Sequence, residues 1–414
     1  MSAEIITIGT ELLHGLVRDT NAERIVELLA GIGIEVHYKT SVGDDSARMA
    51  DAFRAAAHRA RYVVTTGGLG ATPDDVTRKT IATVFRRRLV LDETVLDRMR
   101  ARFRERGVEM PAMNESQALI PKGTKIIENL RGLAPGLHFT YQEANFFVLP
   151  GVPAEAEAMM DQYVVPFLRA SRAGSQVGRR IVRTIGISES ALAERLQGIE
   201  SEEPAIKVGY LPHASGVDVT LAAASPDRAW LTGALDRLEL RVREAAGEAV
   251  YGEEGETLAQ VLGRLLLARK LTIAAAESIT GGGLGAAITS VPGSSRYFLG
   301  GVVAYSNRAK QELLGVRTAT LERHGAVSAP AAEEMAAGAR ERFGCDLALS
   351  TTGVAGPNGG SDEKPVGLVY LGIASRDGSE SARFIFSGVR AEVSARSVSY
   401  ALDLARRHLL RQPV

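Results

Sequence analysis

The stretch Ala275-Ala276-Glu277-Ser278-Ile279-Thr280-Gly281-Gly282-Gly283 decides the fold of the C-terminal third of this chain. The apolar run 271–276 predicts a short buried strand that ends here, and residues 284–288 predict the start of a helix. Ser278 therefore lies at a glycine-rich turn, where a ligand can approach the backbone closely. Backbone amides at a helix start suit a phosphate or the oxyanion of acyl transfer. The commoner alternative is that Ser278 or Thr280 only caps the helix.

The composition indicates a chain of several domains without a bias toward polyanions. Its 414 residues carry 49 basic and 49 acidic side chains, so we expect two or three domains and no bulk binding of nucleic acid. The single cysteine, Cys345, excludes an intrachain disulfide and a CxxC zinc cluster, and the strand-like run after it favours a buried structural thiol. The sequence opens without a signal-peptide pattern and contains no run of the ~20 apolar residues that span a bilayer. We expect a cytoplasmic protein that does not enter a membrane.

Strand and helix patterns alternate through residues 1–172, which predicts βαβ units and a mostly parallel sheet. Ligands of such sheets bind beyond the carboxyl ends of the strands, where two glycine-containing loops are expected. Asn21, after the first loop, can also cap the helix that follows it. The candidate nucleotide-binding residues of the two loops are Gly9, Glu11, Asn21, Gly67, Gly68, Gly70 and Thr72.

Two adjacent acids, Asp74 and Asp75, are expected to open the helix after the second loop, behind Pro73. Two roles remain open for them. They can oppose the helix dipole and cap the helix, or they can bind a divalent cation that bridges to a phosphate.

A small α+β module is predicted for residues 175–252, after a linker at Ala173-Gly174-Ser175. Three strand-like runs and two helical patterns fill it, and Trp230 is expected to anchor its core. A third module, residues 255–414, contains three loops of small residues that follow predicted strands and are expected to converge at one sheet edge.

The three converging loops carry hydroxyl and amide side chains but no histidine, so a Ser–His–Asp triad is unsupported. His324 lies at a predicted helix end, where capping of carbonyls is its expected role. Lys310, one turn into a helix after the second loop, is the best base that remains, since Ser–Lys pairs are a known variant of the triad. A surface position is the commoner one for a helix lysine, and that alternative stays open.

Several motifs of the N-terminal segment resemble the CinA family. They are Gly9-x-Glu11-Leu12-Leu13, Val42-Gly43-Asp44-Asp45, Gly67-Gly68-Leu69-Gly70-x-Thr72-x-Asp74-Asp75, Ala134-Pro135-Gly136 and Leu149-Pro150-Gly151-Val152-Pro153. The resemblance implies the molybdopterin-binding α/β fold of the MoaB and MogA proteins and a metal-dependent ADP-ribose pyrophosphatase activity. Asp74 and Asp75 would then hold the metal, cobalt or magnesium, that polarises the diphosphate. Ala71 stands where the family usually has proline.

The same resemblance implies a KH-like fold for the middle module. A KH domain that clamps nucleic acid uses a GxxG loop, and residues 175–252 contain none. We therefore expect a spacer or dimerisation domain, and a homodimer, rather than a nucleic-acid partner.

The C-terminal segment resembles the α/β domain of CinA and, with it, nicotinamide-nucleotide amidase. The matching motifs are Ala276-Glu277-Ser278-x-Thr280-Gly281-Gly282, Pro292-Gly293-Ser294-Ser295, Tyr305-Ser306-Asn307-x-x-Lys310, Gly325-Ala326-Val327-Ser328, Thr352-Gly353-x-Ala355-Gly356-Pro357 and Lys364-Pro365-Val366-Gly367. That enzyme hydrolyses the carboxamide of nicotinamide mononucleotide to nicotinate mononucleotide and ammonia. The resemblance makes Ser278 the nucleophile and Lys310 its base, and it requires no cofactor. Ile279 stands where many members carry cysteine.

Amides near Gly281 and Gly282 are expected to hold the oxyanion. The candidate substrate-binding residues are Thr280, Gly281, Gly282, Ser294, Tyr305, Asn307, Thr352 and Gly353. The alternative function is a pterin- or nucleotide-binding protein without turnover that acts in competence or DNA repair through partners.

Overall fold

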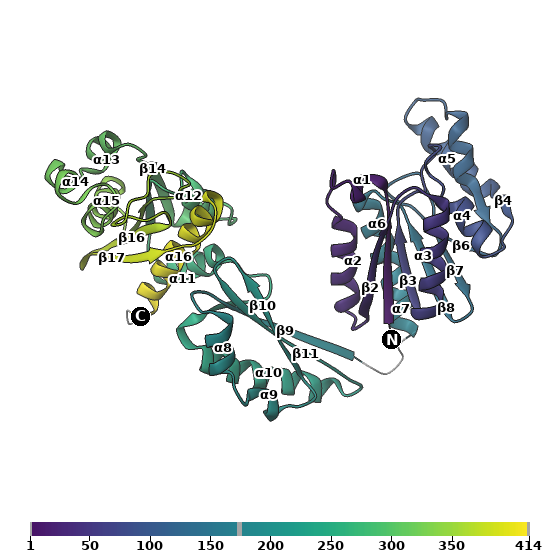
Figure 1. Cartoon of the computed structure of the whole chain (residues 1–414), viewed down its shortest axis with the longest axis horizontal. Helices are drawn as coiled ribbons and strands as arrows, with labels where there is room; N and C mark the ends of the chain where they lie inside the picture. The colour runs from purple at the N-terminus through teal and green to yellow at the C-terminus, as the bar shows by residue number, and fades with distance from the viewer. Residues whose placement is uncertain (1, 172–175, 412–414) are drawn as a thin grey trace. The chain divides into compact units, whose positions relative to one another are not determined.

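The computed structural model describes residues 2–171 and 176–411, so the predicted linker Ala173-Gly174-Ser175 lies outside the described residues. The chain divides into two compact units. The first comprises Met1–Gly178 and Ala224–Leu231, and the second comprises Arg179–Ala223 and Thr232–Val414. Figure 1 shows the helices and strands of both. None of the described helices has the length and apolar composition that spanning a membrane requires.

A six-stranded sheet in the order β2-β1-β3-β8-β7-β6 forms the centre of the first unit. Its first four strands run parallel, while β7 is antiparallel to β8 and β6 to β7. The strands are β1 (Ser2–Ile8), β2 (Glu35–Val42), β3 (Tyr62–Thr66), β6 (Lys125–Ile127), β7 (Gly136–Tyr141) and β8 (Ala144–Leu149). The prediction of a mostly parallel sheet is confirmed.

Helices cover both faces of this sheet (Figure 1), and alternate side chains of β1 enter a different core on each face. Ala3 and Ile5 pack with α2, α6 and α7, whereas Ile6 and Ile8 pack with α3 and α4. The helices are α1 (Thr10–Leu13), α2 (Thr20–Ala30), α3 (Ser46–Arg59), α4 (Thr77–Val84), α5 (Glu93–Glu105), α6 (Pro153–Met159) and α7 (Val165–Ser171). The short elements η1 (Ala112–Ala118), η2 (Met160–Val164), β4 (Leu89–Leu91) and β5 (Leu119–Pro121) complete the unit.

Two predicted helix starts in this unit are wrong. The cap of α2 is Asp19, whose carboxylate accepts the Ala22 amide at 2.9 Å, so Asn21 lies inside the helix. Helix α4 begins at Thr77, so Asp74 and Asp75 precede it in the loop and do not cap it. The reason is that the Asp75 side chain bonds backwards to the glycine loop rather than forwards to helix amides.

The middle module contains a four-stranded sheet in the order β10-β11-β9-β12. Its elements are β9 (Gln176–Thr184), α8 (Glu189–Arg195), α9 (Ile199–Glu202), β10 (Lys207–His213), β11 (Gly216–Ser225), α10 (Arg228–Ala246), η3 (Gly247–Ala249) and β12 (Val250–Glu253). The predicted strands and helices of this module are present. Trp230 is 36% exposed, however, because it lies in the first turn of α10 away from the buried stripe, so its predicted role as a core anchor is wrong.

The C-terminal module is built on a five-stranded sheet in the order β14-β13-β15-β16-β17. The first three strands are parallel, β16 is antiparallel to β15, and β17 is antiparallel to β16. The strands are β13 (Ile273–Glu277), β14 (Phe298–Val303), β15 (Leu347–Gly353), β16 (Leu368–Ser375) and β17 (Gly378–Ile385). The helical elements are α11 (Leu258–Arg269), α12 (Gly283–Thr289), η4 (Ser294–Arg296), α13 (Asn307–Leu314), α14 (Thr318–His324), α15 (Ala329–Phe343) and α16 (Arg390–Arg411).

Strand β13 is buried on both faces, which accounts for its almost continuous apolar sequence. Ile273 and Ala275 pack with α11, α12 and α16, while Ala274 and Ala276 pack with α13, α14 and α15. The strand thus lies at the centre of three layers, and the residue after it, Ser278, is placed at the carboxyl edge of the sheet. Cys345 belongs to the second of these cores, and burial raises the pKa of its thiol to about 11.

A buried ion pair joins α16 to the middle module. Asp403 and Arg406 are 4% and 3% exposed, and the Arg406 Nε donates to Asp403 Oδ1 at 2.7 Å. The same guanidinium donates to the carbonyls of Val250 and Glu248 at 2.9 and 2.6 Å. Because β12 begins at Val250, a cut at the predicted boundary near residue 252 would remove two partners of a buried cation.

We predict that Asp403→Asn lowers the free energy of unfolding by about 3 kcal/mol, since it leaves the buried Arg406 charge without its full partner. Glu244→Gln is the control, because its pair with Arg241 is exposed and such pairs contribute little. Urea unfolding of both variants checks this. Equal midpoints for the two would show that the buried pair does not stabilise the second unit.

Candidate functional site

The turn after β13 fixes the position of Ser278. The Ser278 amide donates to the Thr351 carbonyl of β15 at 2.9 Å, so the residue is tied to the neighbouring strand. Gly281 and Gly282 follow with φ angles of 59° and 104°, in the left-handed region that favours glycine. The N-cap residue of helix α12 is Gly282, and no amide of the helix start donates to the hydroxyl of Ser278 or Thr280, so neither of them caps it. The capping alternative for this stretch is therefore wrong.

Lys310 meets Ser278 inside the module. Its Nζ donates to Ser278 Oγ at 2.9 Å and to the Ala304 carbonyl at 2.8 Å. The lysine is 2% exposed and the serine 9%, which excludes the surface alternative for Lys310. Loss of hydration through burial lowers the pKa of Lys310 from 10.5 to about 8. A buried amine that is readily deprotonated thus contacts a buried hydroxyl.

Sequence reasoning missed Glu277, although it directly precedes Ser278 in the motif. Its carboxylate is 2% exposed and accepts hydrogen bonds from the Thr280 hydroxyl and from the amides of Gly282, Leu284 and Gly285. The Gly282 amide is therefore not available to an oxyanion. The Gly281 amide donates to the Ser278 carbonyl at 3.2 Å. The expectation that these two amides hold the oxyanion does not agree with the geometry.

Two predicted substrate-binding threonines use their hydroxyls within the protein. Thr280 Oγ1 lies 2.7 Å from both Glu277 Oε2 and Thr351 Oγ1, and Thr352 Oγ1 donates to the Ala326 carbonyl at 2.7 Å. Both residues are buried. Their hydroxyls hold the loops together in this structure rather than facing a ligand.

Ile279 has a packing role at the same place. A Cβ added to Gly353 would lie 2.8 Å from the Ile279 Cδ1 atom, so the side chain rests against the Gly353 backbone. Ile279 is 9% exposed and belongs to the core that also contains α12. Ile279, in place of cysteine, therefore fills the core beside the turn that carries Ser278, and it leaves no thiol at this position.

The remaining predicted substrate-binding residues lie on neighbouring loops. Ser294 is buried at the start of η4, Asn307 is exposed at the start of α13, and Tyr305 is 61% exposed. The Tyr305 hydroxyl accepts a hydrogen bond from Arg390, whose other guanidinium nitrogen donates to the Gly356 carbonyl at 3.0 Å. Arg390 was not predicted, because it opens α16 far from any glycine motif. It adds a cation to this loop cluster.

Of the two residues that the sequence excluded from catalysis, Cys345 has its predicted role, whereas the expected capping of carbonyls by His324 is wrong. Cys345 is buried and its thiol donates to the Leu347 carbonyl at 2.9 Å, which confirms a structural thiol. The carbonyl of His324 accepts the Lys364 amine at 2.6 Å, so the lysine, and not the histidine ring, satisfies this helix end.

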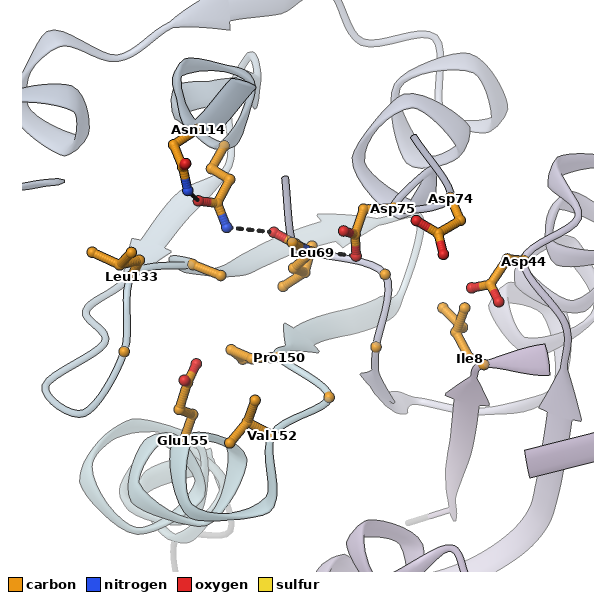
Figure 2. Close-up of a pocket in the computed structure, with 18 of the residues that line it drawn as sticks. Ile8, Asp44, Leu69, Asp74, Asp75, Asn114, Leu133, Pro150, Val152 and Glu155 are labelled. Atoms are coloured by element: carbon orange, nitrogen blue, oxygen red, sulfur yellow. Dashed lines mark hydrogen bonds between the residues drawn. The ribbon is translucent and has the colours of Figure 1, made fainter. Parts of the chain in front are cut away.

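The first unit contains a cavity of about 540 Å³ at the carboxyl ends of its parallel strands (Figure 2). Five of the seven predicted nucleotide-binding residues line it, and so do the two predicted metal ligands: Gly9, Glu11, Gly67, Gly68 and Gly70, with Asp74 and Asp75. Asn21 and Thr72 do not line the cavity but contact residues that do. The Asn21 amide donates to the carbonyl of Gly151, a lining residue, at 2.7 Å, and Thr72 bonds to Asp75.

The glycine loop is held from both sides by charged side chains. Asp75 accepts the amides of Gly70 and Thr72 at 2.7 and 2.9 Å, and the buried Arg78 donates to the carbonyls of Leu69 and Gly70. Gly67 has a φ of 105°, and a Cβ there would lie 2.1 Å from the Ile8 carbonyl, so only glycine fits. The loop shape thus depends on a close approach of two backbones and on Asp75.

The acids of this cavity do not form a metal site held by the protein alone. Both Asp75 oxygens already accept hydrogen bonds from the loop, and the Asp44 carboxylate accepts the Thr10 amide and hydroxyl. Within residues 2–171 and 176–411, no three histidine, cysteine, aspartate or glutamate side chains are grouped so that they could hold an ion. The expected role of Asp75 as a metal ligand does not fit this geometry.

Sequence reasoning assigned no role to the opposite wall of the cavity. Asn114 donates to Gln117, and Gln117 donates to the Leu69 carbonyl at 3.2 Å, so η1 is tied to the glycine loop (Figure 2). Arg131 and Glu155 also line the cavity. These residues lie in irregular segments or at a helix start, where hydrophobic periodicity gives no signal.

Family models match nearly the whole chain. The probable molybdopterin binding domain matches residues 4–170, the damage-inducible protein CinA KH domain matches 179–252, and the CinA C-terminal domain matches 255–409. A crystal structure of a competence/damage inducible protein from Agrobacterium tumefaciens is 38% identical and covers 38% of this chain and 98% of that protein, with a TM-score of 0.36.

Relatives extend over the full length. A putative competence-damage inducible protein of Caldicellulosiruptor saccharolyticus is 39% identical, over 99% of this chain and 100% of the relative. A CinA-like protein of Nostoc punctiforme is 42% identical, again over 99% of this chain and 100% of the relative. With the α/β, KH-like and α/β modules in this order, the chain belongs to the CinA family.

Proposed function

We propose that the C-terminal module hydrolyses the carboxamide of nicotinamide mononucleotide to nicotinate mononucleotide and ammonia. The observation that supports this most directly is the 2.9 Å contact between Lys310 Nζ and Ser278 Oγ, with the lysine 2% exposed. A serine hydroxyl is a weak nucleophile until a neighbour takes its proton, and a neutral lysine amine can do so. The pKa of about 8 for Lys310 makes the neutral form accessible near neutral pH.

In this mechanism the neutral Lys310 amine accepts the Ser278 proton while the serine oxygen attacks the carboxamide carbon. The tetrahedral intermediate collapses as Lys310 returns the proton to the amide nitrogen, and ammonia leaves. Water then attacks the ester that joins the nucleotide acyl group to Ser278, with Lys310 as its base. The products are nicotinate mononucleotide and the free serine, and no cofactor takes part.

The oxyanion needs donors that the protein has not already used. Among the described residues of the turn, the amides of Ile279 and Thr280 have no hydrogen-bond acceptor in the protein, whereas those of Gly281, Gly282 and Gly283 do. We therefore assign binding of the oxyanion to the amides of Ile279 and Thr280. Ser294, Tyr305 and Asn307 remain the candidates that hold the ribose, the phosphate or the ring, and the Arg390 guanidinium adds a donor suited to a phosphate.

We further propose that the first unit binds and cleaves ADP-ribose. The cavity of about 540 Å³, lined by a glycine loop at the carboxyl ends of parallel strands, supports a nucleotide ligand. Because the protein's own acids do not form a closed metal site, a divalent ion such as cobalt or magnesium would need oxygens of the diphosphate as ligands.

One incubation distinguishes these activities from the alternative of nucleotide binding without turnover. Purified protein is given nicotinamide mononucleotide or ADP-ribose, each with and without divalent metal, and the products are separated by chromatography. Ammonia release from the first substrate supports the amidase. Binding of either nucleotide without any product would support a role through partners instead.

Ser278→Ala is predicted to abolish deamidation while substrate binding persists, because only one hydroxyl is lost. Lys310→Ala should lower kcat about as much, and the double variant little further, since residues that act as one unit are not additive. Lys310→Arg should not restore activity, because a guanidinium does not give up its proton. Ammonia release by each variant measures this. Substantial turnover by Ser278→Ala would contradict a covalent mechanism.

The pH dependence of kcat is predicted to follow the Lys310 amine. The lysine acts as a base only when it is neutral, and burial places its pKa at about 8. The rate should therefore rise as the pH increases through 8 and level off above it. Initial rates between pH 6 and 10 with a saturating substrate test this expectation. A rate that continues to rise up to pH 10 would show that the amine has its ordinary pKa.

Asp75→Asn is predicted to weaken ADP-ribose binding even when a chelator has removed all metal. The asparagine nitrogen would face a loop amide, and an unpaired donor of this kind costs about 1–3 kcal/mol. Titration calorimetry in the presence of a chelator measures the binding, and the ammonia assay with nicotinamide mononucleotide is the control, which should not change. If the variant binds normally without metal and loses only metal-dependent cleavage, Asp75 is a metal ligand after all.

A further inference from the structure

The Glu277 carboxylate is buried beside the reacting pair but contacts neither of its reacting atoms. It is satisfied by hydrogen bonds, as a buried carboxylate must be to avoid a large desolvation cost. Its Oε2 accepts the Thr280 hydroxyl at 2.7 Å and the amides of Gly282 and Leu284 at 2.9 Å each. Its Oε1 accepts the Gly285 amide at 2.8 Å. All four donors belong to the turn after Ser278 or to the start of α12.

A chain of hydroxyls extends this contact to the neighbouring strand. Because the Thr280 proton goes to Glu277, the Thr351 hydroxyl must donate to Thr280, over 2.7 Å. The carbonyl of the same Thr351 accepts the Ser278 amide. The carboxylate, the nucleophile turn and β15 are therefore one connected network.

The main chain of Glu277 makes a second link, to the base. Its carbonyl accepts the Ala304 amide at 2.8 Å, and the Ala304 carbonyl accepts the Lys310 amine at 2.8 Å. The amine also reaches Ser278 Oγ at 2.9 Å. A closed ring of contacts thus surrounds the Ser278 hydroxyl, and it is formed by Glu277, Ser278, Ala304 and Lys310.

We infer that Glu277 is a positioning residue for the Ser278–Lys310 pair, because its carboxylate fixes the turn by taking the Gly282, Leu284 and Gly285 amides. It thereby leaves the amides of Ile279 and Thr280 as the unpaired donors of the turn. The expected effect of Glu277 on turnover rests on the proposed amidase function. Its expected effect on the reactivity of the Ser278 hydroxyl is independent of that function, because labelling by a fluorophosphonate probe needs only a serine and its base.

The test measures two rates on the full-length protein. A fluorophosphonate labels Ser278 as the serine oxygen displaces fluoride from phosphorus and the proton passes to Lys310, and mass spectrometry of the labelled peptide gives the rate. Deamidation of nicotinamide mononucleotide gives kcat and KM. Ser278→Ala confirms the site of labelling. Asp403→Asn is the matched control, a buried carboxylate of α16 that pairs with Arg406 and lies outside this network.

Glu277→Ala is expected to lower the labelling rate and kcat together by about 100-fold, the order of loss for a misplacement near 1 Å, while KM changes little. Glu277→Gln should give an intermediate loss, because its oxygen can keep the three bonds of Oε2 while its nitrogen faces the Gly285 amide. Asp403→Asn should melt at a lower temperature and label at the wild-type rate. If Glu277→Ala does not fold, the labelling rate of Glu277→Gln is compared with those of the wild-type protein and Asp403→Asn.

Three results would overturn the inference. One is labelling of Glu277→Ala and Glu277→Gln at the wild-type rate. Another is an equal loss of labelling in Asp403→Asn, which would make the effect one of stability. The third is a shift of more than about one unit in the pH midpoint of labelling of Glu277→Gln, which would make its charge, not its bonds, the cause. Wild-type protein that labels at Ser278 but releases no ammonia would refute only the proposed substrate.

Discussion

A lysine amine can accept a proton near neutral pH only where burial removes the water that favours its charged form. In this protein the amine of Lys310 is in such a place, with the Ser278 hydroxyl and the Ala304 carbonyl as its contacts. The three-layer arrangement around β13 creates that environment. The small residues of β13 let α15 pack closely on one face and α12 on the other, and Ser278 lies beside the amine because it directly follows the carboxyl end of the strand.

The two units hold their glycine loops in similar ways. Each has a glycine loop after a parallel strand, and in each a carboxylate from the motif takes the loop amides. Asp75 does so for Gly70 and Thr72, and Glu277 for Gly282 and its neighbours. Asp75 lies at the nucleotide-sized cavity and Glu277 lies beside Ser278, and both carboxylates accept hydrogen bonds from backbone amides. An acid within a glycine motif is therefore not by itself evidence for a metal ligand.

Much of the architecture could be predicted from the sequence, because buried strands and amphipathic helices have different periodicities. The alternation of strands and helices in residues 1–172 is present as predicted, and Lys310 lies one turn into α13 as expected. Helix starts were less certain, since several polar residues compete to cap a helix. Asp19, and not Asn21, is the N-cap of α2. Helix α4 begins at Thr77, later than predicted, because the Asp75 side chain bonds to the glycine loop.

The hydrogen-bond network around Ser278 and Lys310 could not be predicted from the sequence. Glu277 and Arg390 act through contacts between residues that are distant in the chain or through backbone amides, and neither leaves a periodic pattern. The pairing of Ser278 with Lys310 was inferred from the absence of histidine in the loops and from the resemblance to the CinA family. Its short distance and its burial are properties of the packed sheet.

The titration of the Lys310 amine tests the central claim most directly. Protein labelled with isotopes at lysine can be followed by NMR between pH 6 and 11, and Lys310→Met identifies the signal. We predict one lysine signal that titrates with a pKa of about 8, well below the others. A Lys310 signal that titrates near 10.5 would contradict a neutral lysine as the base for Ser278.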